Sequence, residues 1–205
     1  TILIREGKAQ HLRLHMERLA NSALMLGIPC HLDEVIRVIE LACKDCNTSS
    51  EYRLRLDLDY AGKPSCKVAA ISPLQGPTTL FWASDIFPDP SKAILHSGNV
   101  LLRHKVNTRS LYDQAWKLAE SLGGFDALFV NEHGYVTEGG RTSVFIKSGD
   151  AWLTPPVSAG LLPGVMRSIV LNDPKWNAHE ANLTIDDVRN AKEIMLSNAL
   201  RGLIP

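Results

Sequence analysis

Four features of this 205-residue chain could together form a catalytic site: a lysine, a glutamate and two polar turns. The lysine is Lys105, which ends the run Leu101-Leu102-Arg103-His104-Lys105. If the apolar part of this run is a buried strand, the lysine lies at its rim, where desolvation disfavours the ammonium form. A neutral amine is the nucleophile that forms Schiff bases with carbonyl compounds. The same segment taken alone also fits a solvated basic cluster.

The glutamate is Glu138, which the glycines Gly139 and Gly140 follow directly. Two glycines after a carboxylate allow the backbone to approach a flat ligand closely. A carboxylate that faces a pyridine nitrogen keeps this nitrogen protonated and so strengthens the ring as an electron sink. The alternative interpretation is an ordinary glycine-rich loop between two strands.

Two further segments could bind a phosphate group. The run Leu162-Pro163-Gly164-Val165-Met166-Arg167 predicts a Pro-Gly turn that opens a helix. The free amides of Val165 and Met166 would favour an anion there, together with the helix dipole, although a plain helix start explains the run equally well. Ser197 and Asn198 leave a predicted buried strand and could bind phosphate oxygens, or simply cap a turn.

The elements that must position these residues follow from hydrophobic periodicity. Apolar residues at helical spacing predict a helix over 11–26 and a second one that Asp33 caps. Strict alternation over 53–59, returned by 66–71, predicts a β-hairpin. Beyond these elements, the pattern predicts strands over 1–5, 79–83, 126–130, 135–137, 143–146, 151–154 and 193–197, and helices over 110–122, 164–171 and after Thr184.

The prolines of Phe87-Pro88-Asp89-Pro90-Ser91 favour a linker, because they deny both helix and central strand. We therefore expect two domains, a smaller α+β domain over 1–90 and a larger mixed α/β domain over 91–205 that carries Lys105.

Composition excludes several classes of function. Acidic and basic residues balance at 22 each, so we expect small molecules and other subunits as partners, and neither nucleic acid nor a membrane surface. The four cysteines are irregularly spaced, which indicates a reduced, cytoplasmic compartment. Cys43 and Cys46 have metal-ligand spacing, but no second pair of ligands accompanies them, so no metal site is predicted.

The order and spacing of these segments resemble the class IV aminotransferase family of pyridoxal-phosphate enzymes, also called fold type IV. The resemblance covers essentially the whole chain. It begins at His15-Met16-Glu17-Arg18-Leu19, which matches the family's H-x-x-R-L pattern, and it ends at Ser197-Asn198. It implies a two-domain D-amino acid aminotransferase-like fold of α+β and mixed α/β parts, with pyridoxal 5'-phosphate as cofactor. It also implies a homodimer whose active site lies at the domain junction and is partly completed by the neighbouring subunit.

The resemblance assigns roles to individual residues. Lys105 would bind the cofactor as a Schiff base and shuttle protons, and Glu138 would pair with the pyridine nitrogen. The residues that would hold the phosphate are Arg18, Val165 and Met166 through their amides, and Ser197 or Asn198. The chain departs from the family twice: Lys105-Val106-Asn107-Thr108-Arg109 shifts the asparagine of Lys-x-x-Asn-Arg by one position, and Ser143 stands where relatives often have Asn.

Within the family, the chain most resembles 4-amino-4-deoxychorismate lyase-like proteins, in particular the domain fused behind aminodeoxychorismate synthase. The segments that carry this resemblance are Arg103-His104-Lys105, Tyr112-Asp113, Phe125-Asp126-Ala127-Leu128, Thr137-Glu138-Gly139-Gly140-Arg141 and Asn198-Ala199-Leu200-Arg201-Gly202. It implies β-elimination of 4-amino-4-deoxychorismate to 4-aminobenzoate and pyruvate, a step of folate biosynthesis.

This substrate is a dicarboxylate, so arginines are expected in its pocket. The candidates are Arg103, Arg109 and Arg141, each of which could instead form a surface ion pair. One alternative function is a class IV aminotransferase acting on branched-chain or D-amino acids with a 2-oxo acid acceptor. A catalytically idle subunit that keeps the fold is a third, against which the presence of Lys105 and Glu138 argues.

Overall fold

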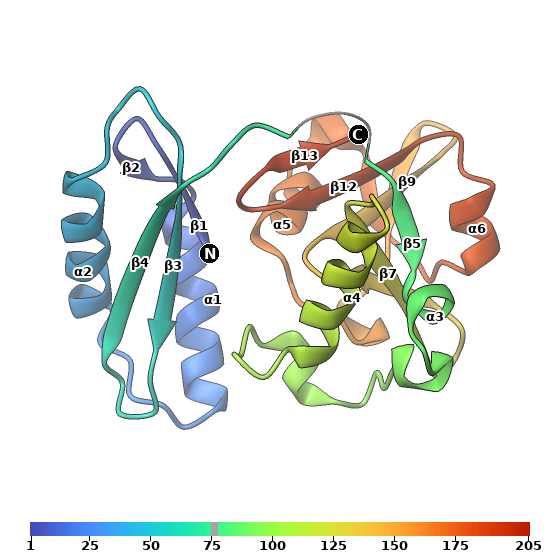
Figure 1. The fold of residues 1–205 in the computed structure, drawn as a ribbon, viewed down its shortest axis with the longest axis horizontal. Helices are drawn as coiled ribbons and strands as arrows, with labels where there is room; N and C mark the ends of the chain where they lie inside the picture. The colour runs from blue at the N-terminus through green and yellow to red at the C-terminus, as the bar shows by residue number, and fades with distance from the viewer. Residues whose placement is uncertain (75–77) are drawn as a thin grey trace. The chain divides into compact units, whose positions relative to one another are not determined.

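The computed structural model describes residues 1–74 and 78–205, and the chain divides into two compact units (Figure 1). The first unit comprises Thr1–Gln75 with Ala199–Arg201, and the second comprises Gly76–Asn198 with Gly202–Pro205. The boundary expected at residue 90 falls inside the second unit. Residues 87–91 lead there into the 3-10 helix η1 (Pro90–Ala93), where the Asp89 side chain accepts a hydrogen bond from the Ser91 amide at 3.1 Å. The Pro-Asp-Pro sequence is thus a helix start and not a linker.

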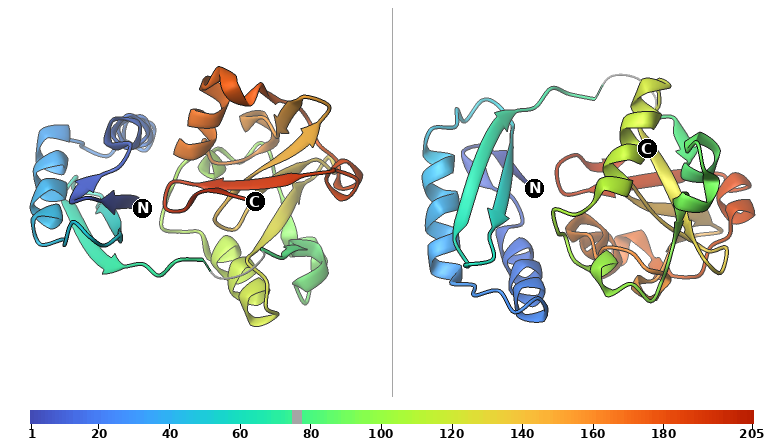
Figure 2. Two further views of the ribbon diagram at one scale, coloured as in Figure 1. Left: turned by 90° about the horizontal axis from the view of Figure 1, so that it is seen from above. Right: turned by 60° about the horizontal axis from the view of Figure 1, so that its bottom comes forward.

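The first unit is a four-stranded antiparallel sheet, covered on one face by two helices (Figure 2). The strand order is β2-β1-β3-β4. The bounds are β1 (Ile2–Arg5), β2 (Lys8–Ala9), β3 (Tyr52–Leu58), β4 (Pro64–Ala70), α1 (Leu12–Met25) and α2 (Leu32–Lys44). The predicted hairpin and both helices are confirmed, but the N-cap of α2 is His31, and Asp33 lies in the first turn. Side chains of Ile4, Ile39 and Leu54 fill the core between sheet and helices.

The second unit contains two sheets and four α-helices among its described residues. One sheet has the order β11-β10-β9-β12-β13, and the other has the order β5-β7-β6 with β8 paired to β7. The strands are β5 (Leu80–Trp82), β6 (Ile94–Leu95), β7 (Asp126–Asn131), β8 (Val136–Gly139), β9 (Ser143–Ser148), β10 (Ala151–Thr154), β11 (Ala178–Glu180), β12 (Ile194–Asn198) and β13 (Gly202–Ile204). The helices are α3 (Ala83–Ile86), α4 (Ser110–Ser121), α5 (Val165–Asn172) and α6 (Ile185–Arg189), with the 3-10 helices η2 (Val100–Arg103), η3 (Val157–Ala159) and η4 (Pro174–Trp176).

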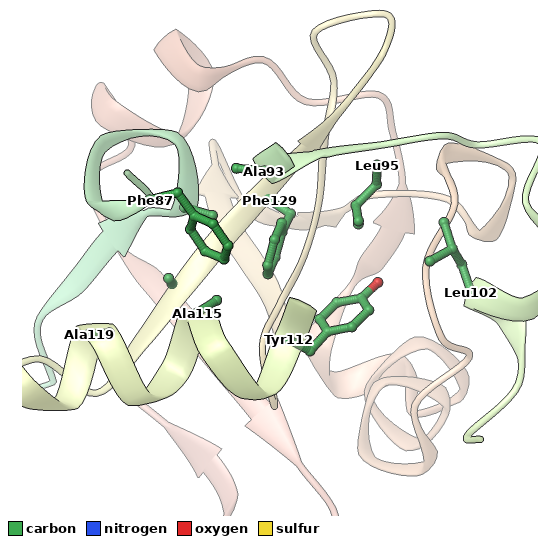
Figure 3. Packing of buried hydrophobic residues seen from close by; sticks show 10 residues of the cluster. Phe87, Ala93, Leu95, Leu102, Tyr112, Ala115, Ala119 and Phe129 are labelled. Atoms are coloured by element: carbon green, nitrogen blue, oxygen red, sulfur yellow. The ribbon is translucent and has the colours of Figure 1, made fainter. Parts of the chain in front are cut away.

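Three hydrophobic clusters join the layers of this unit. Helices α3 and α4 pack on the β7 sheet around Phe129, and Ala115 and Ala119 allow α4 to approach closely (Figure 3). Leu128, Val144, Leu196 and their neighbours fill the space between the two sheets. Phe145, Val170 and Met195 pack α5 against the five-stranded sheet. The mixed α/β character expected of the larger domain is confirmed, and no described helix has the length and apolar character needed to cross a membrane.

A buried aspartate, to which the sequence assigned no structural role, organises the loop after Glu138. Asp126 is fully buried and accepts hydrogen bonds from the Ala127 amide at 2.9 Å, the Arg141 amide at 3.1 Å and Thr142 Oγ1 at 2.7 Å. A Cβ at Gly139 would lie 2.5 Å from Asp126 Oδ2, so this position excludes a side chain. The glycine pair therefore serves the packing around Asp126, where the sequence had suggested close approach of a ligand.

Replacing Asp126 should destabilise the second unit. Asp126→Ala leaves three donors without an acceptor in a buried site, which we expect to lower the free energy of unfolding by about 1–3 kcal/mol. Thermal or urea unfolding of the two variants Asp126→Ala and Asp150→Ala measures this, since Asp150 is exposed at a turn. Equal stability of the two variants would contradict the structural role of the Asp126 network.

Candidate active site

Lys105 lies in the loop between η2 and α4. The strand expected before it is wrong, because Val100–Arg103 form η2, which the Asn99 side chain caps by accepting a hydrogen bond from the Leu101 amide at 3.1 Å. His104 is buried, whereas Arg103 and Lys105 are exposed. Lys105 is therefore presented by a short helix and a loop and is not desolvated at the rim of a strand.

Glu138 is a buried carboxylate on β8 with an arginine beside it. Only 5% of its side chain is exposed, and its Oε1 accepts a hydrogen bond from Arg109 Nη2 at 3.2 Å. Burial raises the pKa of Glu138, and this rise is opposed by Arg109, Tyr112, the Leu162 amide and Lys105. The structure thus brings Lys105 and Glu138 within electrostatic reach of one another, as the two chemical roles require.

The three candidate substrate arginines have different surroundings. Arg109 is paired with Glu138, and its guanidinium lies over the Tyr112 ring, 3.8 Å from the ring centre. Arg141 donates from Nη2 to the Phe125 carbonyl and lies over the rings of Trp116 and Phe125. Arg103 is exposed at the end of η2, next but one to Lys105. Arg109 and Arg141 therefore have intramolecular partners, and Arg103 is the candidate placed most openly near the lysine in the chain.

Three features meet at the start of α5 and suit a phosphate group. Gly164 is the N-cap of α5 with no side-chain cap, so the first-turn amides, Val165 and Met166 among them, point out of the helix without a side-chain acceptor. A Cβ at Gly164 would lie 3.0 Å from Ser143 Oγ, which places this hydroxyl against the helix start. Ser197 pairs directly with Ser143 across β9 and β12, so both side chains lie on the same face of the sheet.

An orphaned hydroxyl supports this assignment. Ser197 is 1% exposed, and its Oγ has no hydrogen-bond partner within the part of the chain that the structure describes. A buried hydroxyl without a partner carries a free-energy cost that an anion at the helix start would relieve. The serines and the helix start therefore fit the phosphate of the expected cofactor. Sequence reasoning identified Ser197 and α5 but not Ser143, whose only signal was the departure from asparagine.

The remaining predicted phosphate ligands are Arg18 and Asn198. Arg18 lies on α1 in the first unit, and Asn198 is the last residue of β12 in the second. Their roles stay predictions. The arginine at the end of the same motif, Arg167, is 4% exposed and donates from Nη2 to the Pro155 carbonyl at 2.7 Å, besides pairing with Glu180. It fastens α5 to the loop after β10, which nothing in its sequence context indicated.

Removing the orphaned hydroxyl should weaken phosphate binding. We expect Ser197→Ala to reduce the affinity for pyridoxal 5'-phosphate by about tenfold, since a hydrogen bond to a charged group contributes about 1.5–3 kcal/mol. Equilibrium titration of the cofactor, followed by its visible absorbance, measures the effect. Ser148→Ala, at the exposed end of β9, is the control. An unchanged affinity in Ser197→Ala would remove Ser197 from the site.

Comparison with known proteins is consistent with this arrangement. The model of the family described as amino-transferase class IV matches residues 1–205. A protein of Schizosaccharomyces pombe, named as an aminodeoxychorismate lyase, is 27% identical over 96% of this chain and 83% of its own length. A protein of Methanocaldococcus jannaschii, named as a branched-chain-amino-acid aminotransferase, is 24% identical over 98% of this chain and 74% of its own length.

A solved structure from Mesorhizobium loti, named as an amino-acid aminotransferase, is also similar. It is 32% identical, has a TM-score of 0.88, and the match covers 100% of this chain and 95% of that one. The family match spans the whole chain, and the fold agrees with it. The chain therefore belongs to the class IV aminotransferase family, and its cofactor is pyridoxal 5'-phosphate.

Proposed function

We propose that the chain is a lyase that converts 4-amino-4-deoxychorismate to 4-aminobenzoate and pyruvate. The observation that carries this proposal is the charged character of the segment around Lys105. Arg103 is exposed two residues before the lysine, whereas Arg109 is already paired with Glu138. Such a site suits a substrate with two carboxylates better than an aliphatic amino acid.

The residues of the chain would divide the work as follows. The bound cofactor supplies an electron sink conjugated to the substrate amine. Glu138 holds a proton at the pyridine nitrogen, and the α5 start with Ser143 and Ser197 fixes the phosphate. The Lys105 amine removes the proton from the carbon that bears the substrate amine. The bond between the ring and the enolpyruvyl oxygen then breaks, the leaving group takes up a proton to become pyruvate, and the ring becomes aromatic.

An aminotransferase acting on branched-chain or D-amino acids is the second candidate. It is favoured by the likeness to the Mesorhizobium loti protein, which is named as an amino-acid aminotransferase. It would use the same lysine and glutamate, but the amino group would remain with the cofactor until a 2-oxo acid accepts it. The two functions therefore differ in whether turnover needs a second substrate.

The proposal also includes the oligomeric state, the cellular compartment and the pathway. A homodimer and a cytoplasmic role in folate biosynthesis follow from the resemblance to 4-amino-4-deoxychorismate lyase-like proteins. The predicted contribution of a neighbouring subunit to the site is part of the same proposal.

Turnover without an acceptor separates the two functions. We expect the cofactor-loaded protein to release 4-aminobenzoate from 4-amino-4-deoxychorismate in the absence of any 2-oxo acid, as followed by product fluorescence. Lys105→Ala should abolish this turnover, because we expect the Lys105 amine to remove the carbon-bound proton. Lys92→Ala, in η1, is the control for loss of a lysine elsewhere.

The contrary outcome is equally specific. If no 4-aminobenzoate forms, but the cofactor absorbance shifts on addition of an amino acid and returns on addition of a 2-oxo acid, the lyase is excluded. The aminotransferase then becomes the function.

A further inference from the structure

Arg109 and Glu138 form a buried ion pair whose geometry is set by the fold. Arg109 is the N-cap of α4, and Tyr112 lies in the first turn of the same helix. Helix α4 packs on β7, and β7 pairs with β8, where Glu138 lies. One helix start and one strand pair therefore fix the guanidinium beside the carboxylate.

The arginine is held on its other side by an aromatic stack. Its guanidinium lies 3.8 Å from the centre of the Tyr112 ring, and that ring packs on Phe129 with 5.0 Å between ring centroids. Figure 3 shows Tyr112 next to Phe129, with its hydroxyl directed away from Phe87. The Arg109 side chain is only 12% exposed, so it is not a mobile surface arginine that could follow a ligand.

The surroundings of Glu138 explain why a fixed cation is needed. The groups that act on it are Arg109, the buried Tyr112 hydroxyl, the Leu162 amide and Lys105. The Tyr112 hydroxyl makes no hydrogen bond of good geometry within the described residues, and burial and the nearby Glu138 charge raise its pKa, so it stays neutral. Lys105 is exposed, and its amine would be bonded to the cofactor, so it would not remain as a lysine cation beside Glu138. Arg109 is thus the permanent charge that can hold Glu138 as an anion.

We propose that Arg109 is a positioning residue, which keeps the Glu138 carboxylate ionised and aimed, and not a partner of the substrate's carboxylates. This inference rests on the proposed role of Glu138 at the pyridine nitrogen. The sequence had suggested that Arg109 binds the substrate. Under this proposal Arg109 acts through Glu138, and Tyr112 holds the guanidinium in place. A carboxylate that binds as an anion takes up the cofactor without releasing a proton, whereas a protonated one must release its proton to pair with a pyridinium.

The test is the pH dependence of cofactor binding, measured as a dissociation constant from visible absorbance between pH 5 and 9. Without Arg109, Glu138 holds its proton to higher pH, because burial raises its pKa and the main opposing charge is gone. We expect Arg109→Met to weaken binding by about tenfold near neutral pH and to recover affinity as the pH rises through the raised pKa of Glu138. Binding by Arg109→Met should release a proton that the wild-type protein does not release at the same pH.

Two further variants make the test decisive. Arg109→Lys keeps the positive charge and should restore most of the wild-type pH profile. Arg189→Met removes an exposed arginine that also lies near an aromatic ring, that of Trp82, and it should behave as wild type. Circular dichroism and melting temperature identify a variant that fails to fold, and Arg109→Lys then still reports on the charge.

The failures of the inference and of the proposed function are distinguishable. If Glu138→Gln leaves cofactor affinity and absorbance unchanged, the role of Glu138 itself is wrong. If Glu138→Gln changes them, but Arg109→Met and Arg109→Lys keep the wild-type pH profile and raise only the KM of the substrate, Arg109 is a substrate ligand and the inference is overturned.

Discussion

The buried carboxylate of Glu138 is the constraint on which the second unit's design depends. A carboxylate with 5% side-chain exposure is costly to ionise unless it is paired and hydrogen-bonded. Here Arg109, the Tyr112 hydroxyl, the Leu162 amide and Lys105 offset that cost. The elements that supply them, α4, the loop after η3 and the loop after η2, must all converge on β8. The site therefore lies where these elements bring their polar groups to one buried carboxylate.

Two buried carboxylates, Asp126 and Glu138, lie close to the turn after β8, and their surroundings differ. Asp126 is enclosed by neutral donors, with the glycines of the turn packed over it, and its role is structural. Glu138 faces cations and a hydroxyl, which is the environment that chemistry requires. The same short turn accommodates both carboxylates. Gly139 and Gly140 leave room for Asp126, and β8 directs Glu138 toward Arg109 and Tyr112. This explains why a glycine pair follows the glutamate without invoking a ligand.

Much of the fold could be predicted from periodicity alone. The alternation in β3 and β4, the helical spacing in α1 and α4, and the capping of α6 by Thr184 all reflect local patterns, and each is observed. The strands β2, β6, β11 and β13 have two or three residues each, too few for any period to appear. The prolines at 88 and 90 misled because a capped 3-10 helix and a linker share the same residues, and only packing distinguishes them.

The candidate site residues also differ in how much the sequence could say about them. Lys105, Glu138 and Ser197 were predicted from the order of motifs, and their roles stay predictions, while the strand expected before Lys105 is the 3-10 helix η2. Arg109 was predicted to bind the substrate, and the structure pairs it with Glu138, which the sequence cannot show because α4 brings it to β8. Tyr112, Ser143 and Asp126 acquire their roles only from contacts across strands and helices. The order of motifs therefore indicated which side chains could belong to the site, and the fold showed which partners each side chain contacts.

The proposed chemistry requires Lys105 to hold the cofactor covalently. The most direct measurement is borohydride reduction of the cofactor-loaded protein, followed by proteolysis and mass spectrometry of the lysine-containing peptides. We expect a phosphopyridoxyl mass on the peptide that contains Lys105 and on no other. A modification on another lysine, such as Lys92 or Lys147, or a protein that carries none after loading, would contradict it.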